Sequence, residues 1–442
     1  MKITFLGGVE EVTGSRNLIE TDDIKILVDC GLFQGERSIA QRNWDPFPIK
    51  PSSIDAIVLT HAHIDHTGYI PVLIKNGFKG KIYCSKGTYD LCTLLLIDSG
   101  NLQEEEAARN NRKPLYTARD AQDSLHFFQV VDDNTVLRLG TLLQITLIRS
   151  YHILGATFVI VSDGKQKLTF SGDLGRPHQL IMKAPPHLKE TDFLVMESTY
   201  GDRLHETGDP IEAFGKIINE TVQKKGIVLI PSFSVGRTQT MLYCLYQLKQ
   251  KKAIPNIPIF LDSPLGISVT QLLCDFNDEH TLGSLCNNVV NVARATSTVK
   301  ESEQIEHIKQ SCIIIAGSGM ANGGRVLNHL QYLISDPKNT IVFLGYQGKG
   351  TIGRELIDGA QKVKIEDTLF TVKAAIKTIN TLSAHADYQE MLDWLSHFEQ
   401  PPKKVFLTHG ELSAAQSFKK KIEERFGWSV VIPKYLESFD LD

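Results

Sequence analysis

The 442-residue sequence lacks the segments that would place it in or across a membrane. Its apolar runs are only a few residues long, whereas a transmembrane helix needs about 20 predominantly apolar residues. The N-terminal stretch MKITFLGGVEEVTGS contains no apolar segment of the kind found in secretory signal peptides. We therefore expect no membrane partner and a cytoplasmic location.

The sequence also has few cysteines, seven in all, and no C-x-x-C pair. An odd number without close spacing argues against a disulfide framework and against a zinc site built from thiolates. We therefore expect reduced thiols. No Walker A or G-x-S-x-G sequence is present, which argues against a P-loop nucleotidase and a serine hydrolase.

A basic excess is missing as well, because the formal net charge is -4 at pH 7. This balance argues against a generic binder of polyanions, whose surface is usually basic. The argument is weak if metal ions bind, since two divalent cations would add four positive charges at one site.

The first two hundred residues have the pattern of strands joined by short turns. KITFLGG and TDDIKILVDCG are expected to pair, and IDAIVLT is a buried run that ends at Thr60. Residues 88–112 have the pattern of a polar-faced helix. Residues 142–171 have that of antiparallel strands, with Asp163 and Gly164 in a tight turn.

The pattern changes near residue 208. Asp209 and Pro210 are typical of a helix start. Four units then follow in which an apolar run leads into a loop of small residues and a helix, and the last seventy residues add two more. This alternation is typical of a parallel sheet, whose ligands bind at the carboxyl ends of its strands.

The segment 60-THAHIDHTGYIP-71 crowds His61, His63, Asp65 and His66 just past a strand. A metal site, a proton-transfer site and a polar turn are the competing explanations. Crowding three imidazoles and a carboxylate without a shared partner is costly, which disfavours the polar turn. Neutral imidazole and carboxylate ligands suit zinc.

Four further residues follow strands elsewhere in the chain: Asp29, His152, Asp173 and His409. Each alone is more often a turn residue or a surface histidine. Because all four stand at strand ends, we expect them to join the histidine cluster and complete a site for two metal ions.

These residues resemble the motifs of a known family. H-x-H-x-D-H, then His152, then SGDLGR resemble the metallo-β-lactamase superfamily, while MESTYGDR, TLSAHAD and LTHGE resemble the three motifs of its β-CASP branch of nucleases. PSFSVGRTQ, SGMANGGR and GYQGKGTIGR resemble the same branch. The whole is most similar to bacterial and archaeal RNases related to the endonuclease subunit of the cleavage and polyadenylation specificity factor.

The resemblance implies an α/β fold, an αββα metallo-β-lactamase sandwich with an inserted β-CASP domain. The sandwich would comprise residues 1–207 and 373–442. The β-CASP domain, a parallel sheet flanked by helices, would comprise residues 208–372.

The resemblance also implies roles for single residues. One zinc ion would be held by His61, His63 and His152, and a second by Asp65, His66 and His409. Asp173 would bridge both ions, and Asp29 would orient ligands. Glu197 would pair with His385 and orient its imidazole.

The glycine motif at Gly348, Gly350 and Gly353 also fits dinucleotide-binding loops. An acidic residue about 20 positions later, at a second strand end, is missing. We expect this loop, with Gln347, to contact nucleic-acid phosphate instead, with a plain turn as the alternative.

Arg237 stands where a loop enters a helix, and its guanidinium is suited to grip a phosphate, with a structural arginine as the equal alternative. Ser232, Ser318 and Ser383 in neighbouring loops are also candidate contacts to the substrate.

The function implied is a zinc-dependent ribonuclease that cleaves single-stranded RNA through a two-metal-activated hydroxide. His385 would protonate the leaving 3′-oxygen and leave a 5′-phosphate, and Asp65 would also orient the nucleophile. A homodimer and the choice between endonuclease and exonuclease action stay open.

Three alternatives remain. A DNA nuclease is disfavoured, because DNA-acting members of the branch usually lack the histidine that stands here as His409. A small-molecule hydrolase would not need the four-unit insertion. A catalytically inactive RNA-binding subunit would lose metal ligands, whereas seven candidates are present.

Overall fold

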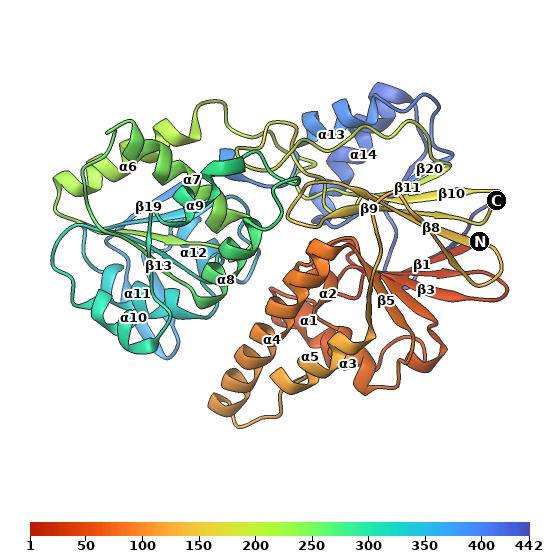
Figure 1. Cartoon of the computed structure of the whole chain (residues 1–442), viewed down its shortest axis with the longest axis horizontal. Helices are drawn as coiled ribbons and strands as arrows, with labels where there is room; N and C mark the ends of the chain where they lie inside the picture. The colour runs from red at the N-terminus through yellow and green to blue at the C-terminus, as the bar shows by residue number, and fades with distance from the viewer. The chain divides into compact units, whose positions relative to one another are not determined.

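The computed structural model describes residues 1–442 and comprises two compact units (Figure 1). The first consists of Met1–Leu204 and Ala384–Asp442, and the second of His205–Ser383. The chain thus leaves the first unit three residues before the predicted boundary at 207. It returns to the first unit eleven residues after the predicted boundary at 373.

Two seven-stranded sheets form the first unit, and neighbouring strands follow the orders β22-β1-β2-β3-β4-β5-β6 and β21-β20-β11-β10-β9-β8-β7. The first sheet consists of β1 (Lys2–Gly7), β2 (Arg16–Glu20), β3 (Lys25–Val28), β4 (Ala56–Val58), β5 (Lys81–Cys84), β6 (Phe128–Val130) and β22 (Ser438–Asp440). The second consists of β7 (Val136–Leu139), β8 (Leu143–Arg149), β9 (Thr157–Ser162), β10 (Lys167–Phe170), β11 (Phe193–Glu197), β20 (Lys404–Thr408) and β21 (Val430–Val431).

The hydrophobic core of this unit lies between the two sheets. Alternate residues of β1, Ile3 and Phe5, and of β8, Ile145 and Leu147, meet in one buried cluster. This two-residue period is the one a strand with one buried face requires. The predicted direct pairing of the first two apolar runs is wrong, because β2 lies between β1 and β3 and pairs with both.

Helices cover the outer faces of the sandwich (Figure 1). Beside the first sheet lie α1 (Arg37–Ala40), α2 (Ile64–Thr67), α3 (Ile70–Lys75), α4 (Lys86–Arg109) and α5 (Ala118–Ser124). Against the second sheet, Trp394 of α13 (Tyr388–Leu395) and Phe418 of α14 (Leu412–Phe426) pack on Leu194 and Leu407. The predicted αββα sandwich is confirmed. None of the helices combines the length and apolar character of a membrane span.

The second unit is built on a six-stranded sheet in the order β14-β13-β15-β12-β16-β19, in which all neighbours are parallel. Its strands are β12 (Val228–Pro231), β13 (Ile259–Asp262), β14 (Arg294–Ala295), β15 (Ile313–Ala316), β16 (Thr340–Leu344) and β19 (Ala375–Ile379). The four predicted strand–loop–helix units are confirmed. The predicted boundary at 373 assigns the strand in AAIKTIN to the sandwich, but this strand is β19 and pairs with β16 in the second unit.

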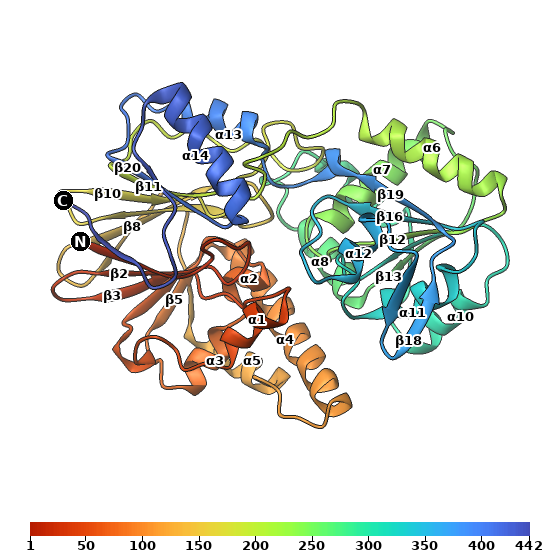
Figure 2. The ribbon, with the colours of Figure 1, turned by 180° about the vertical axis from the view of Figure 1, so that it is seen from behind.

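Helices cover both faces of this sheet (Figure 2). One face carries α6 (Pro210–Gln223), α7 (Arg237–Gln250), α8 (Pro264–Leu273) and α9 (Cys286–Val290), and the other α10 (Val299–Glu306), α11 (Arg325–Leu333) and α12 (Ile352–Ile357). As predicted, Asp209 caps α6 by accepting the N–H of Ile211, and Pro210 is its first residue. A hairpin of β17 (Lys362–Ile365) and β18 (Thr368–Thr371) completes the unit.

One disulfide joins Cys274 to Cys286 in the second unit, at the end of α8 and the start of α9. The expectation of wholly reduced thiols is therefore wrong for this pair. The two residues are 12 positions apart, so the bond closes a short loop. The other five cysteines are free and buried.

Candidate metal centre

The histidine-rich segment leaves β4 and turns at once into the short helix α2. His63 is the residue before the first turn of α2, and Asp65 and His66 lie within it. The turn that follows β3 packs directly behind this helix. A Cβ atom at Gly31 would lie 1.6 Å from the backbone oxygen of Asp65, so only glycine allows this approach.

The remaining ligand candidates come from strands of the second sheet that run in one direction. β8 and β10 are both antiparallel to β9, and β10, β11 and β20 are mutually parallel neighbours. Their carboxyl ends therefore share one edge of the sheet. His152, Asp173, Glu197 and His409 stand at or just after these ends, which is why residues far apart in sequence converge.

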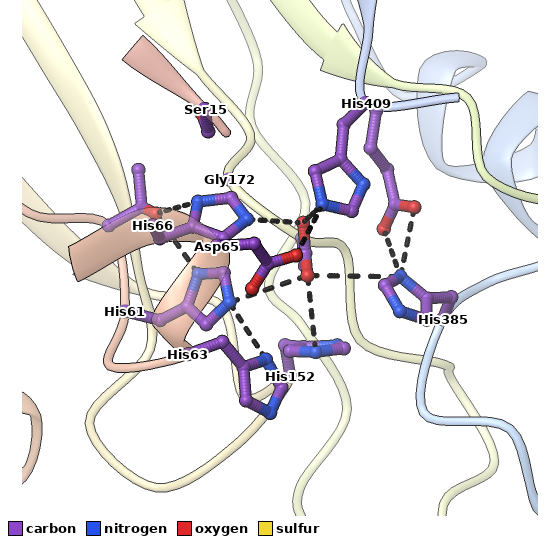
Figure 3. A network of polar contacts seen from close by, with 12 residues as sticks. Ser15, His61, His63, Asp65, His66, His152, Gly172, His385 and His409 are labelled. Carbon is purple, nitrogen blue, oxygen red and sulfur yellow. Dashed lines mark hydrogen bonds and ion pairs between the residues drawn. The ribbon is translucent and has the colours of Figure 1, made fainter. Parts of the chain in front are cut away.

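The first ligand set comprises His61, His63, His152 and Asp173, whose nitrogen and oxygen atoms lie within 4.8 Å of one another. His61 Nε2 lies 3.0 Å from His63 Nδ1. Asp173 Oδ2 lies 3.3 Å from His61 Nε2 and 3.4 Å from His152 Nε2. Figure 3 shows the rings of these histidines directed toward one another.

The second ligand set comprises Asp65, His66 and His409. His409 Nε2 lies 3.4 Å from Asp65 Oδ2, and the other oxygen of Asp173, Oδ1, lies 3.4 Å from His66 Nε2 and 3.5 Å from His409 Nε2. The two oxygens of Asp173 thus face different ligand sets. The family resemblance implies this kind of position for a bridging carboxylate, and bridging itself stays a prediction.

These distances fit metal ions. Four ligand atoms at about 2.0–2.2 Å from one ion are about 3.3–3.6 Å apart in a tetrahedral arrangement. Both ring nitrogens of His152, Nε2 of His66 and Oδ1 of Asp173 are buried without a hydrogen-bond partner. Buried polar atoms of this kind are costly unless something binds them. The donor atoms present therefore suit bound cations.

Burial keeps three of the imidazoles neutral. It lowers the pKa of His61 and His152 below the ordinary value, and that of His63 to about 3. A nearby histidine adds to the effect at each position. The neutral ring is the form that binds a metal.

The carboxylates are ionised at neutral pH. Burial would raise the pKa of Asp173, but the charges of His409 and His66 lower it well below its ordinary range. Burial would likewise raise the pKa of Asp65, but the hydrogen bond to His409 lowers it. In return Asp173 and Asp29 raise the pKa of His66, and Asp173 that of His409, against the opposing effect of burial.

A second layer of side chains orients the ligand rings from their far nitrogens. Asp29 Oδ2 contacts His66 Nδ1 at 2.7 Å, as predicted for an orienting residue. Thr60 Oγ1 lies 3.0 Å from His61 Nδ1, and Thr199 Oγ1 lies 3.1 Å from His409 Nδ1. The sequence analysis missed both threonines. Their signal is a hydroxyl residue two positions after a strand and inside a motif that already contains a candidate ligand or proton donor.

Asp29 is expected to set metal affinity without touching the ion. Its Oδ1 accepts the backbone N–H of Thr60 at 2.8 Å, while its Oδ2 contacts His66. In Asp29→Asn one of these two oxygens becomes an NH2 group, which cannot accept a hydrogen bond. We expect metal affinity to fall roughly 10–100-fold. Titration of metal-free protein with zinc against a chromophoric chelator measures this change.

The matched control is Asp262→Asn in the second unit, where Asp262 Oδ2 contacts His329 Nε2 at the same 2.7 Å. That pair contains no ligand candidate, so metal affinity should not change. Equal losses in both variants would show that Asp29 acts only through general stability.

Several residues around the centre adopt the left-handed backbone conformation. φ is 63° at Asp29, 55° at Tyr151 and 50° at His409. Such conformations cost about 1–2 kcal/mol for a residue with a Cβ atom. At His409 the cost is offset by a backbone hydrogen bond to Gly8 of 2.6 Å. Clustered strain of this kind is typical of functional sites.

Glu197 and His385 lie beside Asp173. His385 Nδ1 contacts Glu197 Oε2 at 3.0 Å and lies 3.9 Å from Asp173 Oδ2. Glu197 also accepts the backbone N–H of Leu174 at 2.5 Å and is buried. The predicted pairing is therefore present, and it holds the imidazole at the edge of the ligand cluster (Figure 3).

The candidate substrate contacts of the second unit lie in loops that follow parallel strands. The first of these loops bonds to the neighbouring strand end, where the Ser232 N–H donates to Ala316 O of β15, and two of the loops bond to each other, where Gln347 Nε2 donates to Gly319 O. Ser318, Gly348 and Ser383 lie in the same set of loops or just after the neighbouring strand β19.

Arg237 is buried and its guanidinium donates to the backbone oxygens of Leu344 (3.2 Å) and Leu382 (2.8 Å). This geometry favours the structural alternative. Contact between phosphate and Arg237, or any other of these loop residues, stays a prediction.

Three family models match the chain. The metallo-beta-lactamase superfamily matches residues 13–211, the Beta-Casp domain residues 238–356, and the Zn-dependent metallo-hydrolase RNA specificity domain residues 370–433. Together they cover most of both units.

Curated relatives match along the whole length. The chain is 33% identical to Ribonuclease TTHA0252 of Thermus thermophilus, with 93% of each chain covered. It is 30% identical to transcription termination factor FttA of Pyrococcus abyssi, covering 100% of this chain and 71% of the relative. A crystal structure of a protein of unknown function from Enterococcus faecalis V583 has a TM-score of 0.55 and 13% identity, covers 99% of each chain, and supports the fold alone. The chain belongs to the metallo-β-lactamase superfamily, in its β-CASP branch.

Proposed function

We propose that this protein is a metal-dependent ribonuclease that hydrolyses phosphodiester bonds of single-stranded RNA. The observation that carries the proposal is the carboxylate of Asp173, whose two oxygens face two separate ligand sets beside the Glu197–His385 pair. The names of the relatives, a ribonuclease and a transcription termination factor, support RNA as the substrate.

The proposed cofactor is two Zn²⁺ ions per chain. All ligand candidates are imidazole nitrogens or carboxylate oxygens, and zinc binds both kinds of atom. Zinc also needs only about four ligands. His61, His63 and His152 would hold one ion, Asp65, His66 and His409 the other, and Asp173 both. Bound zinc would lower the pKa of water toward ~7 and offset negative charge on the phosphate.

The chain's own residues supply the proton chemistry. Glu197 holds His385 by its Nδ1 atom, so the proton for the leaving 3′-oxygen would be donated from Nε2. The product would then carry a 5′-phosphate. Asp65, ionised and partly exposed to solvent, would also orient the attacking water.

Rival functions differ in what they require of the site. An inactive RNA-binding subunit would not need seven converging ligands. A DNA nuclease would use the same metal chemistry, so only a comparison of RNA and DNA substrates distinguishes it from the proposed ribonuclease. A homodimer and a cytoplasmic location stay predictions.

The decisive experiment compares one end-labelled single-stranded RNA with the same sequence as DNA, using zinc-loaded protein and chelator-treated protein as the control. We expect cleavage of the RNA alone, only with metal, and products with a 5′-phosphate. Equal cleavage of both strands would favour the DNA nuclease. Binding of RNA without cleavage would favour the inactive subunit.

A further inference from the structure

The segment that carries His385 runs alongside the segment that carries Asp173. Gly175 and His385 form an isolated antiparallel bridge, and Ala386 N–H donates to Leu174 O at 3.1 Å. These contacts fix the two backbones to each other over only two residues. Because this contact is so short, the orientation of the His385 segment also depends on contacts further along the chain, at the far end of the segment, which is the start of α13.

The far end is held by Arg176. Its Nε lies 3.1 and 3.0 Å from the two carboxylate oxygens of Glu390, and its Nη2 lies 3.0 Å from Oε1. The side chains of Arg176 and Glu390 are only 14% and 15% exposed. A forked, charge-assisted contact with little exposure is among the strongest and most directional available to a protein.

Glu390 belongs to the first turn of α13. Its Oε2 accepts the N–H of Asp387 at 3.0 Å, and Asp387 Oδ1 accepts the N–H groups of Gln389 and Glu390, both at 2.9 Å. This is a capping box, with Asp387 only two residues after His385. Arg176 therefore holds the start of α13, and through it the His385 turn, against the strand end that carries Asp173.

The helix does not depend on Arg176 for its own stability. The reciprocal cap is complete without the guanidinium, and α13 buries Met391, Leu392, Trp394 and Leu395 in the core of the first unit. Loss of Arg176 would leave the anionic Glu390 at a helix N-terminus, where negative charge is favourable. The helix would stay formed while its tie to the Asp173 segment is lost.

We propose that Arg176 is a positioning residue, which through Glu390 fixes the imidazole of His385 relative to Asp173 and the reacting phosphate. The inference rests on the proposed function, in which His385 donates a proton to the leaving oxygen. A displacement on the order of 1 Å at a reacting group can cost about 100-fold in rate.

The test uses Arg176→Met, which keeps an unbranched side chain as far as the position of Nε but removes the charge and the forked guanidinium, and Arg176→Lys, which keeps the charge. Arg425→Met is the control, because Arg425 also ties α13 to another element, through a more exposed contact to Asp393 at 3.0 Å, six residues along the chain from Asp387. Zinc content and thermal midpoint are measured for all three.

Each variant is assayed on RNA and on the same strand with a 3′-sulfur leaving group at one bond, which needs little protonation. Arg176→Met should lower kcat on RNA about 10–100-fold with KM and zinc content unchanged, and its defect should shrink to within about 3-fold on the sulfur substrate. Arg176→Lys should fall between, and Arg425→Met should match wild type.

Hydrogen–deuterium exchange without substrate gives an independent readout. The Ala386 amide should exchange at least about 10-fold faster in Arg176→Met, while amides in the middle of α13 stay protected. Unchanged exchange, or equal defects on the two substrates, would overturn the proposal. Wild-type protein that leaves RNA uncut would instead refute the ribonuclease, and exchange would still decide whether Arg176 holds the segment.

Discussion

His385→Ala is expected to lower cleavage of RNA roughly 10²–10⁴-fold while leaving both metal ions bound. His385 contacts Glu197 and, with it, forms a group beside Asp173 that is separate from the two sets proposed to hold the ions. Without it the leaving 3′-oxygen departs unprotonated, which raises the barrier of the chemical step. Single-turnover rates on an end-labelled RNA, with zinc measured in the same samples, give the effect.

A sulfur leaving group separates proton donation from other roles of His385. A thiolate leaves readily without a proton, so the defect of His385→Ala should largely disappear on RNA with a 3′-sulfur at the scissile bond. His397→Ala is the control, because His397 follows α13 and contacts the backbone oxygen of Asp393 and the ring of His187, neither of which belongs to the ligand cluster. A defect of equal size on both substrates would show that His385 binds or orients rather than donates a proton.

The cluster of ligand candidates could be predicted from the sequence because its residues stand where local patterns end. A strand is recognisable from its apolar residues, and a polar residue directly after it faces the edge of the sheet. His409 directly follows β20, and His61, His152 and Asp173 stand within three residues of the ends of β4, β8 and β10. The motif order then assigned them to two ions, and the divided carboxylate of Asp173 agrees with that assignment.

What the sequence could not provide is the identity of distant partners. β19 has the same local pattern whether it joins one sheet or the other, and only its pairing with β16 places it in the second unit. The partner of Arg176 lies 214 residues away. The bond between Cys274 and Cys286 requires their closeness in space, which spacing alone does not reveal.

Arg237 shows that the partner of a charged side chain is equally hard to predict from the sequence. A guanidinium at a helix start suits phosphate, and the sequence alone could not tell that backbone oxygens of Leu344 and Leu382 would take its hydrogens. The positions of backbone carbonyl groups depend on the fold, so a sequence pattern does not reveal which of them lie near a given side chain. Arginine in a glycine-rich loop is therefore a weak predictor of ligand contact until the fold is known.

Asp173→Ala should abolish binding at both metal positions, whereas a single histidine substitution should affect one. Asp173 Oδ2 faces His61 and His152, and Oδ1 faces His66 and His409. His152→Ala should therefore reduce zinc content from two ions toward one, and His409→Ala likewise. Losing the several kcal/mol that metal ions contribute to the transition state should lower the rate of Asp173→Ala by about 10³-fold or more.

Metal counting and thermal stability check this arrangement together. Zinc at about 100 times its Kd stabilises a folded protein by ~2.7 kcal/mol, so added zinc should raise the thermal midpoint of the wild type and not that of Asp173→Ala. The single histidine variants should show an intermediate rise. Retention of two ions by Asp173→Ala would mean that each ligand set binds its ion alone, and Asp173 would then act only by orienting the rings of His66 and His409.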